Sequence, residues 1–153
     1  MANDRFVYVT YLRATPDKVW EALTEPGFQR QYWFGMHIDS DFRAGSPWTL
    51  QFADGRIADE GEVLESEPPR RLVISWRHRL RPELAAEGEA RACFDIEPGE
   101  GMVKLSVVHE IGRENSQLIH AVSGGWPSIL SSLKSLLETG EPLSRYQPQS
   151  EAA

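Results

Sequence analysis

Residues 126–140 read Trp-Pro-Ser-Ile-Leu-Ser-Ser-Leu-Lys-Ser-Leu-Leu-Glu-Thr-Gly, and the architecture follows from what this stretch must pack against. Its apolar residues recur at helical spacing: Trp126, Ile129, Leu130, Leu133, Leu136 and Leu137. They form a wide apolar stripe along a helix, which needs an apolar surface to cover. Gly140 is a favourable stop, because glycine readily adopts the left-handed conformation that ends many helices. The same phase continues upstream, so we expect the helix to begin near Asn115, with a kink or restart around Pro127.

The surface for this helix is predicted between residues 36 and 110, where turns rich in glycine and proline separate runs of alternating apolar residues. Such a pattern is typical of an antiparallel meander with one apolar face. The inward rows are Trp48, Leu50 and Phe52, then Leu72, Ile74, Trp76 and His78, then Ala92, Phe94 and Ile96, and finally Val103, Leu105, Val107 and His109. We therefore expect the helix to pack on an apolar sheet face that carries two histidines.

Shorter elements precede and interrupt the meander. Residues 5–12 predict a strand, and residues 16–24 a helix that Thr15 caps and Pro16 begins. A second helical turn is expected over residues 28–34. Residues 80–89 are too polar for a core strand, and we expect a mobile flap or a single helical turn at the sheet rim. The predicted fold class is therefore α+β.

Composition and charge narrow the function classes. The 153 residues, of which 41% are hydrophobic, suit one domain with a full core. A net charge of −7 argues against nucleic acid and anionic membranes as partners. A single cysteine, Cys93, excludes an intrachain disulfide, and no apolar run is long enough to cross a membrane, so we expect a cytoplasmic protein. We predict a folded domain over residues 1–140 and a flexible tail over residues 141–153.

Several motifs occur in a characteristic order along the chain. They are Ala14-Thr15-Pro16-Asp17-Lys18-Val19-Trp20-Glu21-Ala22-Leu23-Thr24, Tyr32-Trp33-Phe34, Gly61-Glu62-Val63-Leu64-Glu65, Pro68-Pro69-Arg70-Arg71-Leu72, Ser75-Trp76 and Gly125-Trp126. With them, residues 5–139 resemble the family of activator homologues of the ninety-kilodalton heat shock protein (Hsp90) ATPase, within the START-like superfamily, also called SRPBCC or birch-pollen-allergen-like.

This resemblance implies a helix-grip fold, in which a curved antiparallel sheet wraps around a long C-terminal helix and two short helices follow the first strand. It also implies a cavity between helix and sheet, and it implies no shared catalytic set. In eukaryotic co-chaperones of this family, a separate chaperone-binding domain precedes the helix-grip domain. Nothing of that kind fits in front of Arg5, so we expect a stand-alone domain.

The predicted function is a non-enzymatic binding domain for a small hydrophobic or amphipathic molecule held in that cavity. The predicted ligand-binding residues are Trp33, Trp48, Phe52, Trp76, His78, Phe94, His109, Trp126 and Leu130. Their aromatic rings would supply apolar contact area, and the two histidines would supply hydrogen bonds. We assign no catalytic residue, no cofactor and no metal.

Two other function classes remain open. The domain could be a chaperone ATPase accessory that works through exposed strand edges and the face of Arg77 and Arg79, alone or as a homodimer. It could also be a cyclase or hydrolase, which would need His78 or His109 close to the other or to a carboxylate. The acidic residues from Asp59 to Glu67 are interpreted as a solvated strand edge. Cys93 alternates with the inward residues of its strand and is therefore expected to point outward, which argues against a Cys-His pair.

Overall fold

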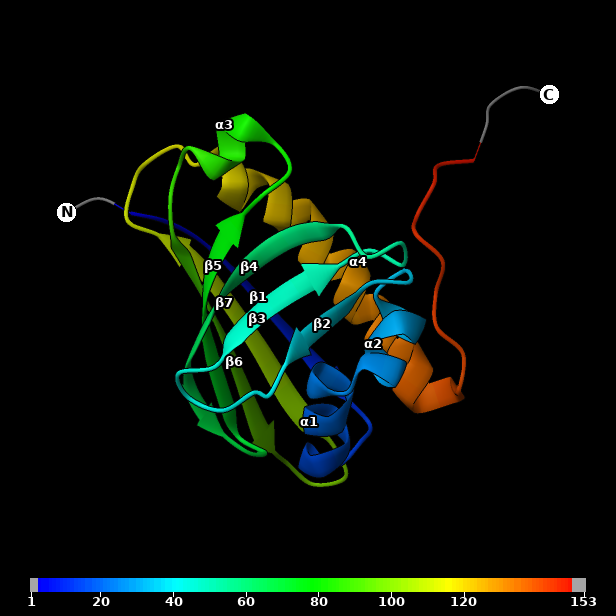
Figure 1. The fold of residues 1–153 in the computed structure, drawn as a ribbon. Coiled ribbons are helices and arrows are strands. Elements are labelled where there is room, and N and C mark those ends of the chain that lie inside the picture. Colours follow the sequence, from blue (N-terminus) through cyan, green and yellow to red (C-terminus); the bar gives the residue numbers. More distant parts are fainter. Residues whose placement is uncertain (1–2, 150–153) are drawn as a thin grey trace.

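The computed structural model describes residues 3–149 and has the predicted order of elements (Figure 1). These are β1 (Asp4–Leu12), α1 (Pro16–Thr24), α2 (Pro26–Tyr32), β2 (His37–Ser40), β3 (Pro47–Gln51), β4 (Ile57–Glu67), β5 (Arg71–His78), α3 (Pro82–Ala85), β6 (Ala90–Pro98), β7 (Val103–Ile111) and α4 (Gln117–Thr139). Seven strands form one antiparallel sheet in the order β1-β7-β6-β5-β4-β3-β2. The predicted meander is confirmed, and β1 extends it by pairing with β7.

The two short helices follow from local capping. The Thr15 hydroxyl accepts the Lys18 N–H at 3.2 Å and starts α1 as predicted. The second helix begins at Pro26, two residues earlier than expected, because the Glu25 carboxylate accepts the Gly27 N–H at 3.0 Å. Proline at the first helical position then loses nothing, since that N–H has no partner in a helix.

The long helix α4 grips the inner face of the curved sheet (Figure 1). The Ser116 hydroxyl caps its first turn by accepting the Ile119 N–H at 3.0 Å, and Gly140, with φ of 88°, ends it in the predicted left-handed conformation. The helix runs through Pro127 without the expected restart. Its apolar stripe, which includes Trp126, Leu130 and Leu133, is buried against the inward rows of the strands. The predicted helix-grip fold is confirmed.

The segment at the sheet rim forms one helical turn, α3, in agreement with one of the two predicted alternatives. Leu84 on this turn is buried. Just beyond it, Glu87 accepts the Gln117 N–H at 2.8 Å and also the Ser116 hydroxyl, so its carboxylate ties the rim to the start of α4. Partial burial would raise the pKa of Glu87, but these hydrogen bonds outweigh it and hold the pKa below its ordinary value.

One close backbone approach shapes the middle of the sheet. The Trp48 indole N–H donates to the Ser75 carbonyl at 2.9 Å, directly above Gly61 of the intervening strand β4. A Cβ at position 61 would lie 2.0 Å from that carbonyl oxygen, so only glycine fits here. No helix among residues 3–149 is both long and apolar enough to cross a membrane.

Candidate ligand-binding site

A cavity of about 310 Å³ lies between α4 and the inner face of the sheet. This volume is at the small end of the range for small-molecule sites. Its lining residues are Trp33, Met36, Leu50, Asp59, Trp76, His78, Leu84, Leu118, Ala121, Val122, Gly125, Trp126, Ile129 and Arg145. Helix α4 contributes the largest part of the wall, and most of the side chains are apolar. Polar atoms come chiefly from the β4 and β5 residues and from Arg145.

Four of the predicted ligand-binding residues line the cavity: Trp33, Trp76, His78 and Trp126. The other predicted residues, Trp48, Phe52, Phe94, His109 and Leu130, are not among its lining residues. Trp48, Phe94, His109 and Leu130 are buried in the core behind the wall. Phe52 lies just after β3, in the turn before β4, where the Arg56 guanidinium covers its ring at 4.5 Å from the centroid.

The aromatic wall is built around Trp76. Its ring centroid lies 4.7 Å from that of Trp48, 5.0 Å from that of His109 and 5.8 Å from that of Trp126. Trp126 in turn contacts Trp33 at 5.6 Å, so aromatic contacts continue from the sheet through α4 to the end of α2. Residues behind the wall therefore hold the lining rings in place through edge and tilted contacts.

His109 belongs to the core. It is fully buried, and its Nδ1 accepts the Trp126 indole N–H at 3.1 Å, which leaves the ring proton on Nε2. Burial lowers the pKa of His109 to about 3, so the ring is neutral near pH 7. The ring is thus a neutral acceptor that orients Trp126.

His78 lies beside a buried carboxylate. Its Nδ1 is 2.8 Å from Oδ1 of Asp59, and the Trp76 indole N–H donates to the same oxygen at 2.9 Å. The cross-strand register brings them together, because Asp59 of β4 pairs directly with His78 of β5. Burial raises the pKa of Asp59, although the hydrogen bonds from His78 and Trp76 act in the opposite direction.

The other ring nitrogen of His78 is buried without a partner in residues 3–149. Nε2 is buried and has no hydrogen-bond partner among the described residues, and the ring lines the cavity. An ionised Asp59 would accept the proton on Nδ1 and leave a lone pair on Nε2, whereas a protonated ring would donate from Nε2. The Asp59–His78 pair can therefore accept or donate one hydrogen bond inside an apolar space.

The sequence interpretation missed Asp59. It was assigned to a solvated acidic edge, but it is only 7% exposed, and this assignment was wrong for Asp59. Its acidic neighbours Glu62, Glu65 and Glu67 do not line the cavity. The signal that could have found Asp59 is the pairing of β4 with β5, since an inward histidine on one strand needs a polar partner opposite it.

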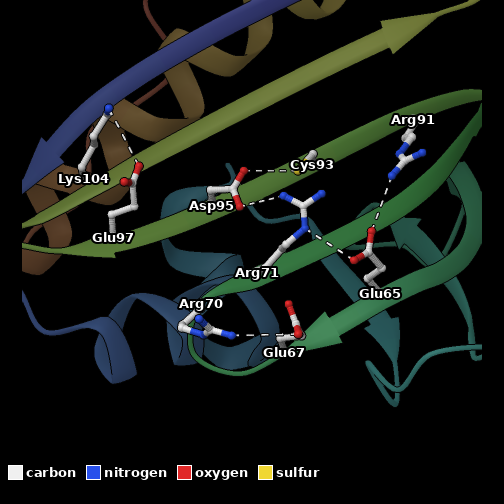
Figure 2. A network of polar contacts seen from close by, with 9 residues as sticks. All are labelled: Glu65, Glu67, Arg70, Arg71, Arg91, Cys93, Asp95, Glu97 and Lys104. Atoms are coloured by element: carbon white, nitrogen blue, oxygen red, sulfur yellow. Dashed lines mark hydrogen bonds and ion pairs between the residues drawn. The ribbon is translucent and has the colours of Figure 1, made fainter.

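Cys93 lies on the outer face of the sheet, within a network of charged side chains (Figure 2). Its Sγ is 3.4 Å from Oδ2 of Asp95, whose other oxygen accepts from Arg71 at 2.9 Å. Burial and the neighbouring Asp95 raise the pKa of the Cys93 thiol to about 11. The thiol is protonated near pH 7, and Cys93 lies on the same outward side of its strand as Asp95, as predicted.

A curved antiparallel sheet closed by a long C-terminal helix over a cavity defines a helix-grip domain of the START-like class. Over residues 13–138 the sequence matches the family described as Activator of Hsp90 ATPase homolog 1-like protein, and the chain belongs to this family. Among curated proteins, none matches the chain.

Solved structures share this fold. DynU16, from the dynemicin biosynthetic locus, is 26% identical to this chain with a TM-score of 0.75. The match covers 94% of this chain and 50% of DynU16, so this chain spans half of that protein's length. CalU16 from Micromonospora echinospora is 25% identical with a TM-score of 0.72, covering 91% of this chain and 76% of CalU16. The Aha1 dimer from Colwellia psychrerythraea is 23% identical with a TM-score of 0.70, covering 92% of this chain and 98% of that one, and it supports the fold alone.

Proposed function

We propose that this protein binds a small hydrophobic or amphipathic molecule in the cavity between α4 and the sheet. The observation that carries the proposal is a largely apolar cavity of about 310 Å³ whose wall includes the ring of His78, with its buried Nε2 unpartnered by any residue that the structure describes. A buried polar atom without a partner costs about 1–3 kcal/mol, which a ligand that hydrogen-bonds to it would recover. Trp33 and Trp126 would contact the apolar body of that ligand.

Binding can be tested with N-phenylnaphthylamine, a neutral fluorophore that brightens in apolar sites. We expect saturable binding, accompanied by quenching of the tryptophans that line the cavity. The blocking variant is Gly125→Leu, because Gly125 lines the cavity and a Cβ at this position meets only Ile129 Cδ1 at 4.0 Å, so we expect the added side chain to occupy cavity space. It should weaken binding at least about tenfold, the equivalent of about 1.4 kcal/mol.

The matched control is Gly124→Leu, which makes the same change at the preceding residue of α4. Gly124 is exposed and lines the neighbouring hollow rather than this cavity, and a Cβ there meets nothing within 4 Å. Both variants also remove a helix-weakening glycine, so neither is expected to unfold the protein. Absence of saturable binding in the wild type, or equal binding by the two variants, would count against a ligand site in this cavity.

A second candidate function is acid–base catalysis by the Asp59–His78 pair, favoured by the 2.8 Å contact between its side chains. In this proposal His78 Nε2 would take a proton from a water molecule as its oxygen attacks the ester carbonyl and the aryloxide leaves. Asp59 would stabilise the imidazolium until it returns the proton to the aryloxide. Turnover of activated aryl esters should then be lost in His78→Gln and kept in His120→Gln, a change at an exposed histidine of α4. A rate no faster than buffer alone, or equal rates in the two variants, would exclude hydrolysis by this pair.

Family membership supports a third proposal, a chaperone ATPase accessory that acts through the face of Arg77 and Arg79. Arg77 is exposed, whereas Arg79 is already paired with Glu60 at 2.9 Å. Stimulation of the cognate Hsp90 ATPase should therefore depend on Arg77 and be reduced by Arg77→Glu, but not by Arg43→Glu at another exposed arginine. Failure of the wild type to bind or stimulate the chaperone would end this proposal.

The predicted homodimer is supported by the free edge of the sheet at β1. Here Val7, Val9 and Tyr11 are 47%, 41% and 54% exposed. Such an edge can pair with another strand. Sedimentation should show a dimer, and Val9→Pro should weaken it because proline removes a backbone hydrogen-bond donor from the strand. A wild-type protein that stays monomeric at high concentration would contradict pairing through this edge.

A further inference from the structure

The segment after α4 is fastened to that helix. Beyond Gly140 the chain turns back, and the Ser135 hydroxyl donates to the Glu141 carbonyl at 2.7 Å. The Ser132 hydroxyl both donates to the Leu143 carbonyl and accepts the Leu143 N–H, each at 3.1 Å. Ser132 is fully buried, whereas Leu143 is 50% exposed, so this pair of hydrogen bonds is partly buried. The tail therefore runs beside α4 in a defined position (Figure 1).

This attachment brings Arg145 to the cavity. Arg145 is one of its lining residues, and it also lines an adjoining outer hollow together with Trp33, Phe34, Gly125 and Ile129. Its guanidinium stacks over the Phe34 ring at 4.6 Å from the centroid. Stacking uses the flat face of the guanidinium and leaves its N–H edges free to form hydrogen bonds.

The cavity thus has two different polar ends. Arg145 lies where the cavity adjoins the outer hollow, beside Gly125 and Ile129, whereas Leu118 and Leu84 of α3 line the cavity but not the hollow. Between positions 118 and 129, α4 rises roughly 16 Å. Among the described lining residues the charged ones are Asp59 and Arg145, and Asp59 is engaged by His78 and Trp76. The positive charge of Arg145 therefore faces the ligand site.

We propose that the ligand is an apolar, ring-containing molecule with one anionic group, such as a carboxylate, and that Arg145 holds this anion at the cavity mouth. The rings pack against Trp33 and Trp126, whose own rings touch each other, and a polar atom at the far end reaches the His78 ring. The planar fork of a guanidinium suits a carboxylate or sulfonate better than a neutral group. This inference rests on the proposed binding function and adds the charge of the ligand to it.

A matched pair of probes tests the charge preference. Anilinonaphthalenesulfonate has the ring system of N-phenylnaphthylamine plus one sulfonate, so the two probes differ in charge. Each is titrated against the wild type, Arg145→Gln and Arg145→Lys, with Arg43→Gln as a control that removes the same charge from an exposed loop outside the cavity. We expect Arg145→Gln to weaken the sulfonate probe roughly five- to tenfold and the neutral probe less than about twofold.

Arg145→Lys should give an intermediate loss for the sulfonate probe, and Arg43→Gln no loss. The sulfonate affinity of the wild type should also fall as salt is raised, whereas that of Arg145→Gln should not. If Arg145→Gln weakens both probes equally, or if Gly125→Leu leaves sulfonate binding intact, the anion inference is overturned. Binding of the neutral probe in the cavity would still support the proposed binding function in that case. If neither probe binds, both proposals fall together.

Discussion

Nε1 of Trp126 donates a hydrogen bond to Nδ1 of His109 at 3.1 Å, which joins the middle of the gripping helix to the inward row of β7. The contact is buried, and it needs a neutral imidazole, because a protonated ring has no lone pair to accept from the indole. The grip of α4 on the sheet therefore depends on the protonation of one core histidine.

Stability should accordingly fall in mild acid. Burial lowers the folded pKa of His109 from its ordinary 6.5 to about 3, so between these values the unfolded chain binds a proton that the folded protein excludes. The stabilisation is complete above pH 6.5 and is lost as pH falls toward 3, by about 1.4 kcal/mol per pH unit. Urea unfolding at a series of pH values measures this slope.

The matched variant for this slope is His109→Gln, whose amide oxygen can still accept from Trp126 but does not titrate. Other groups contribute equally to both proteins, so the difference between the two curves isolates His109. Parallel curves between pH 7 and 5 would contradict the assignment of a neutral buried histidine.

Gly61→Ala should destabilise the sheet by about 2–4 kcal/mol, since the new methyl group would displace the Ser75 carbonyl and the Trp48 indole from each other. Urea unfolding measures the free energy of unfolding. Gly124→Ala is the control, because its Cβ meets nothing within 4 Å and should stabilise α4 by up to about 1 kcal/mol. A loss at Gly61 no larger than at Gly124 would refute the close approach.

Cys93 should react slowly with iodoacetamide in the folded protein. A thiol pKa of about 11 rather than 9.0 leaves about a hundredfold less thiolate near pH 8. Mass spectrometry follows the alkylation, and urea-unfolded protein gives the unshifted rate. Asp95→Asn should accelerate the reaction, because Asp95 helps to raise the pKa of the thiol. If the folded wild type is alkylated as fast as the unfolded protein, Cys93 is not shielded.

Ser132→Ala should release the tail from α4, since it removes both hydrogen bonds to Leu143. Trypsin cleavage after Arg145 should then become faster, by at least about fivefold if the pair contributes about 1 kcal/mol. Ser131→Ala, at a half-buried neighbour on α4, serves as the control. Unchanged cleavage in both variants would mean that the tail is not held by Ser132.

Periodicity was sufficient for the elements of this fold. The 3.6-residue repeat from Leu118 to Leu137 predicted α4, and alternation predicted the inward rows of the strands that the helix covers. Thr15 and Gly140 marked helix ends because capping depends on neighbouring residues alone. The extended helix through Pro127 was less predictable, since tertiary packing compensates for one missing backbone hydrogen bond.

The candidate site was only partly predictable, because its polar groups come from segments far apart in the chain. The alternation of residues along the strand placed Trp76 and His78 on the inner face of the sheet. It could not predict which inward rings would line the cavity and which, like Trp48, would pack behind another ring. The register of β4 against β5 set Asp59 opposite His78, and two hydrogen bonds to Ser132 brought Arg145 to the cavity mouth.

By itself, then, the sequence determined the elements and their inward faces, because these follow from short-range repeats, caps and turns that each segment carries within itself. The order of its motifs, through their resemblance to a known family, indicated the helix-grip fold. Only the tertiary structure decided that Asp59 is buried beside His78, that His109 is a neutral core acceptor and that Arg145 lines the cavity. Burial and pairing are properties of how distant segments meet, and a pKa or a binding surface exists only once they have met.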